Sequence, residues 1–89
     1  MLYTWDEFKS RVNLNKRKLD FADAEQIFAG PTFTFEDDRL NYGEQRCVTL
    51  GLLEDKVLVI VHTETKEEIR IISMRKANKN EQILFYRNL

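Results

Sequence analysis

The fold is decided by residues 46–74, "RCVTLGLLEDKVLVIVHTETKEEIRIISM", in which three apolar, β-branched runs follow one another closely. The runs occupy residues 46–53, 56–63 and 68–74, and the intervals between them are short enough for hairpin turns. The middle run contains "VLVIV", which is continuously apolar, as expected of a central strand covered on both faces. We therefore predict an antiparallel meander of three strands.

Two helices are predicted on the N-terminal side of this meander. Residues 2–5, "LYTW", suit a short edge strand that precedes them. Asp6 can cap the first helix, in which Phe8 and Val12 are spaced to share one face. Asp20 can cap the second helix, which carries an apolar stripe of its own.

The remaining segments complete the predicted architecture. Residues 32–36, "TFTFE", alternate as a strand does, and residues 37–45 form a polar loop before the meander. Residues 77–88 suit a helix that closes the chain. This order of elements predicts an α+β fold: an antiparallel sheet with two N-terminal helices and a C-terminal helix.

The composition is that of an ordinary soluble globular protein. The 89 residues are 43% hydrophobic and 33% charged, and we expect them to form one domain, residues 1–89. The longest apolar stretch, residues 57–61, is too short to span a bilayer, and the first residues lack the apolar run of a signal peptide. The formal net charge of −1 argues against a generic nucleic-acid-binding protein, which usually has a strong basic excess.

The sequence gives no indication of a metal or a cofactor. Cys47 is the single cysteine, so it can form neither an internal disulfide nor a thiol-rich zinc site, which fits a reducing cytoplasm. The three adjacent acidic residues 36–38 read as a solvated loop, and no Gly-rich phosphate loop is present. We therefore expect a cytoplasmic protein that needs no metal and no cofactor.

The only histidine, His62, stands near the end of the central strand. The ordinary pKa of an imidazole, near 6.5, would suit a general acid or base at neutral pH. The alternative is a hydrogen-bonded histidine at a strand end that has no part in any chemistry.

Three arginines form a second candidate constellation. Arg46 opens one predicted strand, and Arg70 and Arg75 belong to the last strand of the meander and its end. Guanidinium groups are always charged, and they can stabilise the negative charge that builds on a phosphate when a 2′-hydroxyl attacks it. The alternative for each arginine is a surface ion pair with a neighbouring glutamate.

The strand register decides which of these side chains meet. A turn at residues 54 and 55 places Arg46 across from Thr63, and a turn at residues 65 and 66 places Arg70 opposite Val61. In that register His62 shares a face with Ser73, and Arg46 shares the other face with Arg70. A slip of one residue brings Arg70 to the face of the histidine instead.

Several of these segments together resemble one family, the BrnT toxins of type II toxin–antitoxin modules. The resemblance is carried, in matching order, by "WDEFKSRVNLNKRKLDFADAEQIF", "GEQRCVTLG", "VIVHTE" and "RIISMRKANKNE". It implies a RelE-like fold and a metal-independent endoribonuclease that arrests growth by cleaving RNA. It also implies neutralisation by a ribbon-helix-helix antitoxin similar to BrnA.

The resemblance and the chemistry of the side chains together define the candidate site. We expect His62, Arg46, Arg70 and Arg75 to act in catalysis, and Lys9, Ser73, Lys76 and Lys79 to bind the substrate. The chain departs from the family pattern at residues 16–18, where Lys-Arg-Lys stands in place of the usual Lys-His-Gly. A histidine and a helix-ending glycine are therefore absent, and Arg17 cannot transfer a proton near pH 7.

Two other functional classes compete with the enzyme. The first is a binding module that keeps affinity for RNA or an antitoxin without cleaving RNA. The second is a structural partner protein with an ionic surface, for which no salt-sensitive RNA binding is expected. Cleavage of RNA that EDTA does not affect would favour the enzyme over both.

Overall fold

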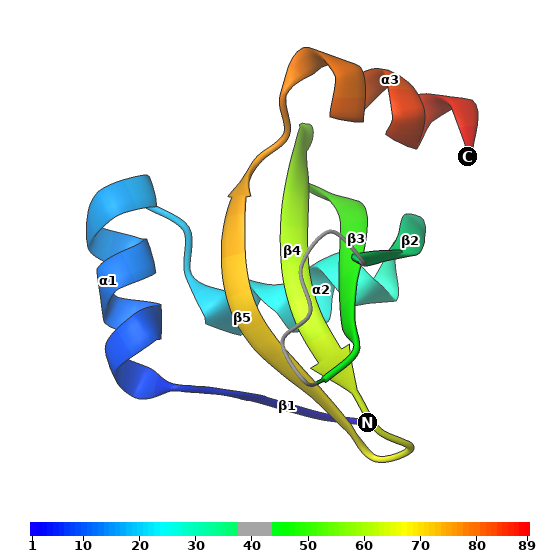
Figure 1. Ribbon diagram of the computed structural model, residues 1–89. Helices are drawn as coiled ribbons and strands as arrows, with labels where there is room; N and C mark the ends of the chain where they lie inside the picture. The colour runs from blue at the N-terminus through cyan, green and yellow to red at the C-terminus, as the bar shows by residue number, and fades with distance from the viewer. Residues whose placement is uncertain (38–43) are drawn as a thin grey trace.

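The predicted meander forms the centre of the molecule (Figure 1). In the computed structural model, which describes residues 1–37 and 44–89, the three strands are β3 (Arg46–Leu53), β4 (Lys56–Glu64) and β5 (Glu68–Lys76). β4 pairs antiparallel with both of its neighbours. Apolar side chains cover β4 on both faces, which confirms the prediction made from its continuous apolar run.

Two further strands extend the sheet at its edges. β2 (Thr32–Asp37) pairs antiparallel with β3, and β1 (Leu2–Trp5) pairs with β5, giving the order β1-β5-β4-β3-β2. The β1–β5 pair is parallel, so the sheet is mixed and not wholly antiparallel as predicted. The parallel pair joins the two ends of the sequence, because β1 precedes both N-terminal helices and β5 follows all the other strands.

The helices begin where the predicted caps stand. Asp6 accepts a hydrogen bond from the backbone N–H of Lys9, at 3.0 Å, at the start of α1 (Glu7–Arg17). Asp20 caps a 3₁₀ turn, η1 (Phe21–Asp23), which leads directly into α2 (Ala24–Ala29). α3 (Lys79–Arg87) begins with a capping box at its first turn. The two N-terminal helices and the C-terminal helix are therefore confirmed.

The sheet has two faces, named here for the helices that pack on them. On the α2 face, η1 and α2 cover apolar side chains of β4 and β5, and Phe21, Ile27 and Ile60 are almost fully buried there. On the α3 face, Phe85 of α3 packs against a second cluster that includes Val57 and Val59. Figure 1 shows α2 lying across the sheet and α3 beyond the upper ends of the strands.

A β-bulge sets the register between β4 and β5. Val61 pairs with Ser73, but His62 pairs with Ile71, so β5 contains one extra residue between them. Arg70 lies opposite Thr63, and not opposite Val61 as the predicted turn required. The reason is a longer turn, because Glu64 pairs with Ile69 and the backbone N–H of Thr65 donates to the oxygen of Glu68. The bulge lies beyond these pairs, and it brings Arg75 to the same face of the sheet as Arg70.

The inner side of α1 is polar, and the face that Phe8 and Val12 share, as predicted, does not belong to the core. Phe8 is 75% exposed, whereas Ser10 and Asn13 are buried. The Asn13 side chain donates to the backbone oxygen of Leu19, at 3.1 Å, and accepts from the backbone N–H of Met74, at 3.3 Å. β1 pairs with β5 only as far as Ile71, so α1 supplies the partner that the edge of β5 needs beyond that point.

Candidate functional site

A cleft of about 320 Å³ opens on the α3 face of the sheet. Its apolar lining consists of three valines from β3 and β4 and one aromatic ring from β2, and its polar lining comes from β2, β5 and α3. These residues are Val48, Val59, Val61, Phe35, Glu36, Asp37, Arg75 and Glu81. Glu36 pairs with Cys47, so strand alternation assigns its side chain to the face opposite Phe35. The cleft therefore combines a hydrophobic floor with one guanidinium and the carboxylates of Asp37 and Glu81.

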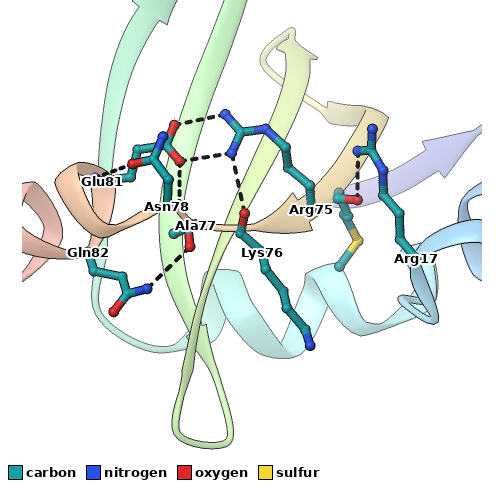
Figure 2. Close-up of polar contacts among 8 residues, drawn as sticks. Arg17, Arg75, Lys76, Ala77, Asn78, Glu81 and Gln82 are labelled. Carbon is teal, nitrogen blue, oxygen red and sulfur yellow. Dashed lines mark hydrogen bonds and ion pairs between the residues drawn. The ribbon is translucent and has the colours of Figure 1, made fainter.

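Arg75 is held in this cleft by a two-pronged ion pair with Glu81, shown in Figure 2. Nη1 and Nη2 of the arginine each donate to one carboxylate oxygen at 2.8 Å. Oε1 of Glu81 also accepts from the backbone N–H of Asn78, at 2.9 Å, as part of the α3 capping box. The start of α3 therefore fixes the direction of the guanidinium, although the Arg75 side chain remains 39% exposed.

Phe35 forms a second wall of the cleft. Its side chain belongs to β2, an edge strand, and the residue is 38% exposed. Its ring centroid lies 5.9 Å from that of Phe33, which packs against the core beneath. An exposed ring that a second ring supports is the kind of surface on which a nucleic-acid base can stack.

The other two arginines belong to the same face of the sheet. Arg70 pairs with Thr63, one residue beyond His62, so it lies on the α3 face together with Arg75. Arg46 precedes Cys47, which pairs with His62, so strand alternation assigns Arg46 to the α3 face as well. Arg46 lies 3.4 Å from Glu44, and Arg70 forms no ion pair within the described part of the chain. The three predicted arginines thus share one face.

His62 lies on the opposite face, away from the arginines. Its side chain is fully buried, and Nε2 lies 2.7 Å from the Thr49 hydroxyl. The ring of Phe28 meets it edge-on, with centroids 5.2 Å apart. Burial lowers the pKa of His62 from 6.5 to about 4, so the imidazole is neutral at pH 7. The structure does not bring together the histidine and the arginines that the sequence grouped in one site.

The second ring nitrogen of His62 has no hydrogen-bond partner among the described residues. Nδ1 lies 3.4 Å from Oε1 of Glu64, close enough for an ion pair if the ring were charged, but the geometry does not meet that of a hydrogen bond. The neutral ring is therefore held by its contact with Thr49 and by packing. This environment fits the alternative considered for His62, a hydrogen-bonded histidine at a strand end that has no part in any chemistry.

The four predicted substrate-binding residues lie outside the Arg75 cleft. Lys9 and Ser73 line a groove between α1 and β5. Lys76 and Lys79 are exposed at the end of β5 and the start of α3, next to Arg75 in the chain. Lys76 pairs with Leu58, so its side chain lies on the face opposite Arg75. Of the residues that line the cleft, Arg75 was among the predicted site residues and the others were not. One sequence signal was available: Asn78 and Glu81 have the spacing of a capping box, which predicts that a helix begins there and holds Glu81 close to the end of the preceding strand.

Arg17 and Lys18, which stand where the resemblance led us to expect histidine and glycine, both have a role in the fold. Lys18 ends α1 in the left-handed conformation, with φ 61°, at the position where the resemblance led us to expect a glycine. Arg17 donates to the backbone oxygen of Met74, at 3.3 Å (Figure 2). Its role in the fold is therefore to complete the cover of the β5 edge that Asn13 begins.

The described residues contain neither a cluster of metal ligands nor a reactive thiol. Within residues 1–37 and 44–89, no three His, Cys, Asp or Glu side chains lie close enough together to hold a metal ion. Burial raises the pKa of Cys47, with further contributions from Glu64 and Glu36, so its thiol stays protonated. Asp38 and most of the predicted loop at 37–45 lie outside the described residues. No helix in the described part is long and apolar enough to cross a membrane.

Comparisons with known proteins agree on one family. A family model described as "Ribonuclease toxin, BrnT, of type II toxin-antitoxin system" matches residues 5–81. The 1.1 Å crystal structure of the Brucella abortus ribonuclease toxin BrnT superposes with a TM-score of 0.70 at 24% identity, covering 89% of this chain and all of that one. That structure supports the fold. No curated protein matches the chain.

Proposed function

The chain belongs to the BrnT family of ribonuclease toxins of type II toxin–antitoxin systems, and on that premise we propose that it is a metal-independent endoribonuclease acting at the Arg75 cleft. The observation that carries this proposal is the cleft itself. It combines a fixed guanidinium with an apolar floor and an exposed aromatic ring. A phosphate can be held by the first of these features, and a base by the other two.

The proposed reaction is cleavage by the substrate's own 2′-hydroxyl. The 2′-oxygen attacks the adjacent phosphorus, the bond to the 5′-oxygen breaks, and the products end in a 2′,3′-cyclic phosphate and a 5′-hydroxyl. Arg75 stabilises the negative charge that develops on the phosphate oxygens, and Glu81 keeps the guanidinium aimed at them. Arg46 and Arg70, which both lie near Thr63 toward one end of the strands, bind phosphates further along the α3 face.

We assign the proton transfers to the carboxylates of the cleft and a structural role to His62. The proton leaving the 2′-hydroxyl needs an acceptor in contact with the substrate, and the carboxylates of Asp37 and Glu81 line the cleft. His62 is fully buried beneath α2 on the other face, where no phosphate can reach it. The exposed side chains of Lys76, at the end of β5, and Lys79, at the start of α3, contact flanking RNA.

The family also implies a protein partner. A type II toxin is neutralised by an antitoxin protein, and we propose a ribbon-helix-helix protein similar to BrnA. Release of the toxin from this partner would allow RNA cleavage in the cytoplasm and arrest growth. Expression of the chain with and without its antitoxin should therefore differ in growth rate.

The enzyme is tested by incubating the purified protein with single-stranded RNA, with and without EDTA. We expect cleavage that EDTA does not change, with fragments ending in 2′,3′-cyclic phosphate. Arg75→Ala should slow cleavage roughly 10²–10³-fold, the typical cost of losing one group that stabilises developing charge, and Arg75→Lys should recover part of the loss. Cleavage that stops with EDTA, or that survives Arg75→Ala, would contradict this assignment.

One observation favours the second candidate function, an RNA- or antitoxin-binding module without nuclease activity. The charge of Arg75 is already paired with Glu81, so a phosphate has to compete with a carboxylate for the same guanidinium. In that case the protein binds single-stranded RNA in a salt-sensitive manner, but leaves it intact after long incubation.

A further inference from the structure

The first helix carries a hydrophobic residue that the rest of the structure leaves uncovered. Phe8 belongs to the first turn of α1, shortly after strand β1, and its side chain is 75% exposed. The side of α1 that is buried contains Ser10 and Asn13, and Asn13 bonds to the backbone of β5. Polar contacts therefore fix the helix in place, and its aromatic side chain contributes nothing to the core.

This side chain lines a groove of about 310 Å³ between α1 and β5. The apolar part of the lining consists of Phe8 and Val12 from the helix and Ile72 from the strand. The polar part consists of Lys9, Asn13, Lys16, Arg17 and Ser73. The groove thus has an apolar surface with cationic side chains along it, and it contains no acidic residue.

The charge of the helix differs from that of the whole chain. α1 carries four basic residues and one acidic residue, whereas the chain has a formal net charge of −1. A ligand that fits this groove should therefore carry negative charges beside apolar groups. In a protein ligand, aspartates or glutamates beside a stripe of apolar side chains would provide both the negative charge and the apolar surface.

The backbone at the groove limits how a partner can bind. The N–H of Met74 is occupied by Asn13, and the oxygen of Met74 by Arg17, so the edge of β5 cannot accept another strand there. Binding has to use side chains, as when an amphipathic helix lies in a groove. RNA is favoured less, because two of the three apolar side chains are aliphatic and offer no flat ring for a base.

We propose that this groove docks an acidic amphipathic helix of the antitoxin, with apolar side chains against Phe8 and Val12 and carboxylates toward Lys9, Lys16 and Arg17. The identity of the partner as an antitoxin rests on the proposed function. The groove shares no lining residue with the Arg75 cleft, so peptide binding and RNA cleavage can be measured independently. In this arrangement Lys9 contacts the protein partner and not RNA.

Two synthetic, fluorescein-labelled helical peptides of equal length test the proposal. Both carry the same leucine stripe at helical spacing, but one has glutamates on its flanks and the other has lysines. In fluorescence anisotropy, the acidic peptide should bind the full-length protein at least about tenfold more tightly than the basic one. Phe8→Ala should weaken binding of the acidic peptide about tenfold, as expected for an aromatic anchor, and Lys16→Glu should weaken it as well.

A matched control is available on α3. Tyr86 is 53% exposed and lies outside the groove, so Tyr86→Ala removes a similar aromatic ring from another surface and should leave peptide affinity unchanged. Circular dichroism will check that all variants are folded. Absence of binding, or equal weakening by Phe8→Ala and Tyr86→Ala, would overturn the proposal.

Two further outcomes separate this proposal from the enzyme. If a single-stranded RNA oligonucleotide loses affinity with Phe8→Ala while the acidic peptide does not, the groove is an RNA surface and the proposal is wrong. If the wild-type protein fails to cleave RNA but binds the acidic peptide through Phe8, the docking proposal stands and the nuclease proposal fails. Folded Phe8→Ala protein should cleave free RNA at the wild-type rate.

Discussion

The two faces of the sheet each hold one of the polar groups that the sequence singled out, but in opposite environments. On the α2 face, His62 is fully buried, neutral and bonded to Thr49. On the α3 face, Arg75 stays charged and partly exposed above a valine floor, held by Glu81. The difference shows that the covering helix decides whether a polar residue near a strand end is buried or stays accessible to a ligand.

Electrostatics explains this division of roles. An imidazole can lose its proton and enter a dry interior as a neutral ring, whereas a guanidinium stays charged in proteins and has to remain paired or solvated. α2 seals its face with Phe28 and Ile27, while α3 leaves a cleft of about 320 Å³ beside its first turn. A phosphate can therefore reach Arg75 but not His62.

The largest predicted effect concerns the buried histidine and pH. The unfolded chain binds a proton on His62 below pH 6.5, but the folded protein does so only below about pH 4. Stability should therefore fall as pH drops through this window, by about 3 kcal/mol from this residue, and then level off. Urea unfolding of the wild type and His62→Gln at several pH values measures it.

His62→Gln supplies the control in the same experiment, because the carboxylates titrate in both proteins. The difference in unfolding free energy between wild type and variant should shrink as pH falls from 7 to 4. A difference that stays constant over this range would mean that the imidazole titrates normally, and that the α2 face is not dry.

Close packing on the α2 face can be tested at Gly51. A Cβ built at this position would lie 2.6 Å from Cγ2 of Ile27, a buried side chain of α2. Gly51→Ala should therefore destabilise the protein by about 2 kcal/mol, a typical cost of overpacking. Gly30→Ala is the matched control, because its nearest contact would be an ordinary 3.8 Å. Equal melting temperatures of the two variants would contradict the packing described here.

The openness of the α3 face can be tested at Phe35. Loss of base stacking typically costs about 1–3 kcal/mol, so Phe35→Ala should raise KM for RNA roughly tenfold. The melting temperature should change little, because the residue is 38% exposed on an edge strand. Unchanged cleavage kinetics would show that RNA does not use this wall of the cleft.

The smallest effect is expected at the end of α1, away from both faces. Lys18 adopts φ 61°, a conformation that favours glycine. Lys18→Gly should stabilise the protein by up to about 1 kcal/mol, because it removes the left-handed strain of a side-chain-bearing residue. Differential scanning calorimetry should show a slightly higher Tm. A lower Tm would mean that the bond from Lys18 Nζ to the oxygen of Asn15, at 2.9 Å, outweighs this strain.

Local patterns in the sequence predicted most of the fold. The meander, its central strand and the caps at Asp6 and Asp20 follow from periodicity and side-chain chemistry over a few residues. The parallel β1–β5 pair was not predicted, because it joins segments at opposite ends of the chain. The polar inner side of α1 was not predicted either, because it depends on the distant edge of β5, where Asn13 supplies a partner to the backbone.

The site was predicted less completely than the fold. Regular alternation along β5 would place Arg70 and Arg75 on opposite faces, and the single extra residue in the strand brings them to the same face. No local sequence pattern predicts this bulge. The burial of His62 depends on contact with Phe28, which belongs to α2 and is distant from His62 in the sequence. Sequence therefore identified residues with suitable chemistry, whereas their grouping depended on tertiary contacts.

The most direct test of the central claim, that RNA chemistry belongs to the α3 face alone, is a cleavage assay with one variant from each face. The rates of Arg75→Ala and His62→Gln are compared with the wild type at pH 7, after both variants are shown to be folded. We predict that Arg75→Ala loses roughly 10²–10³-fold in rate, while His62→Gln stays within about threefold of the wild type. A folded His62→Gln protein that has lost as much activity as Arg75→Ala would contradict the claim.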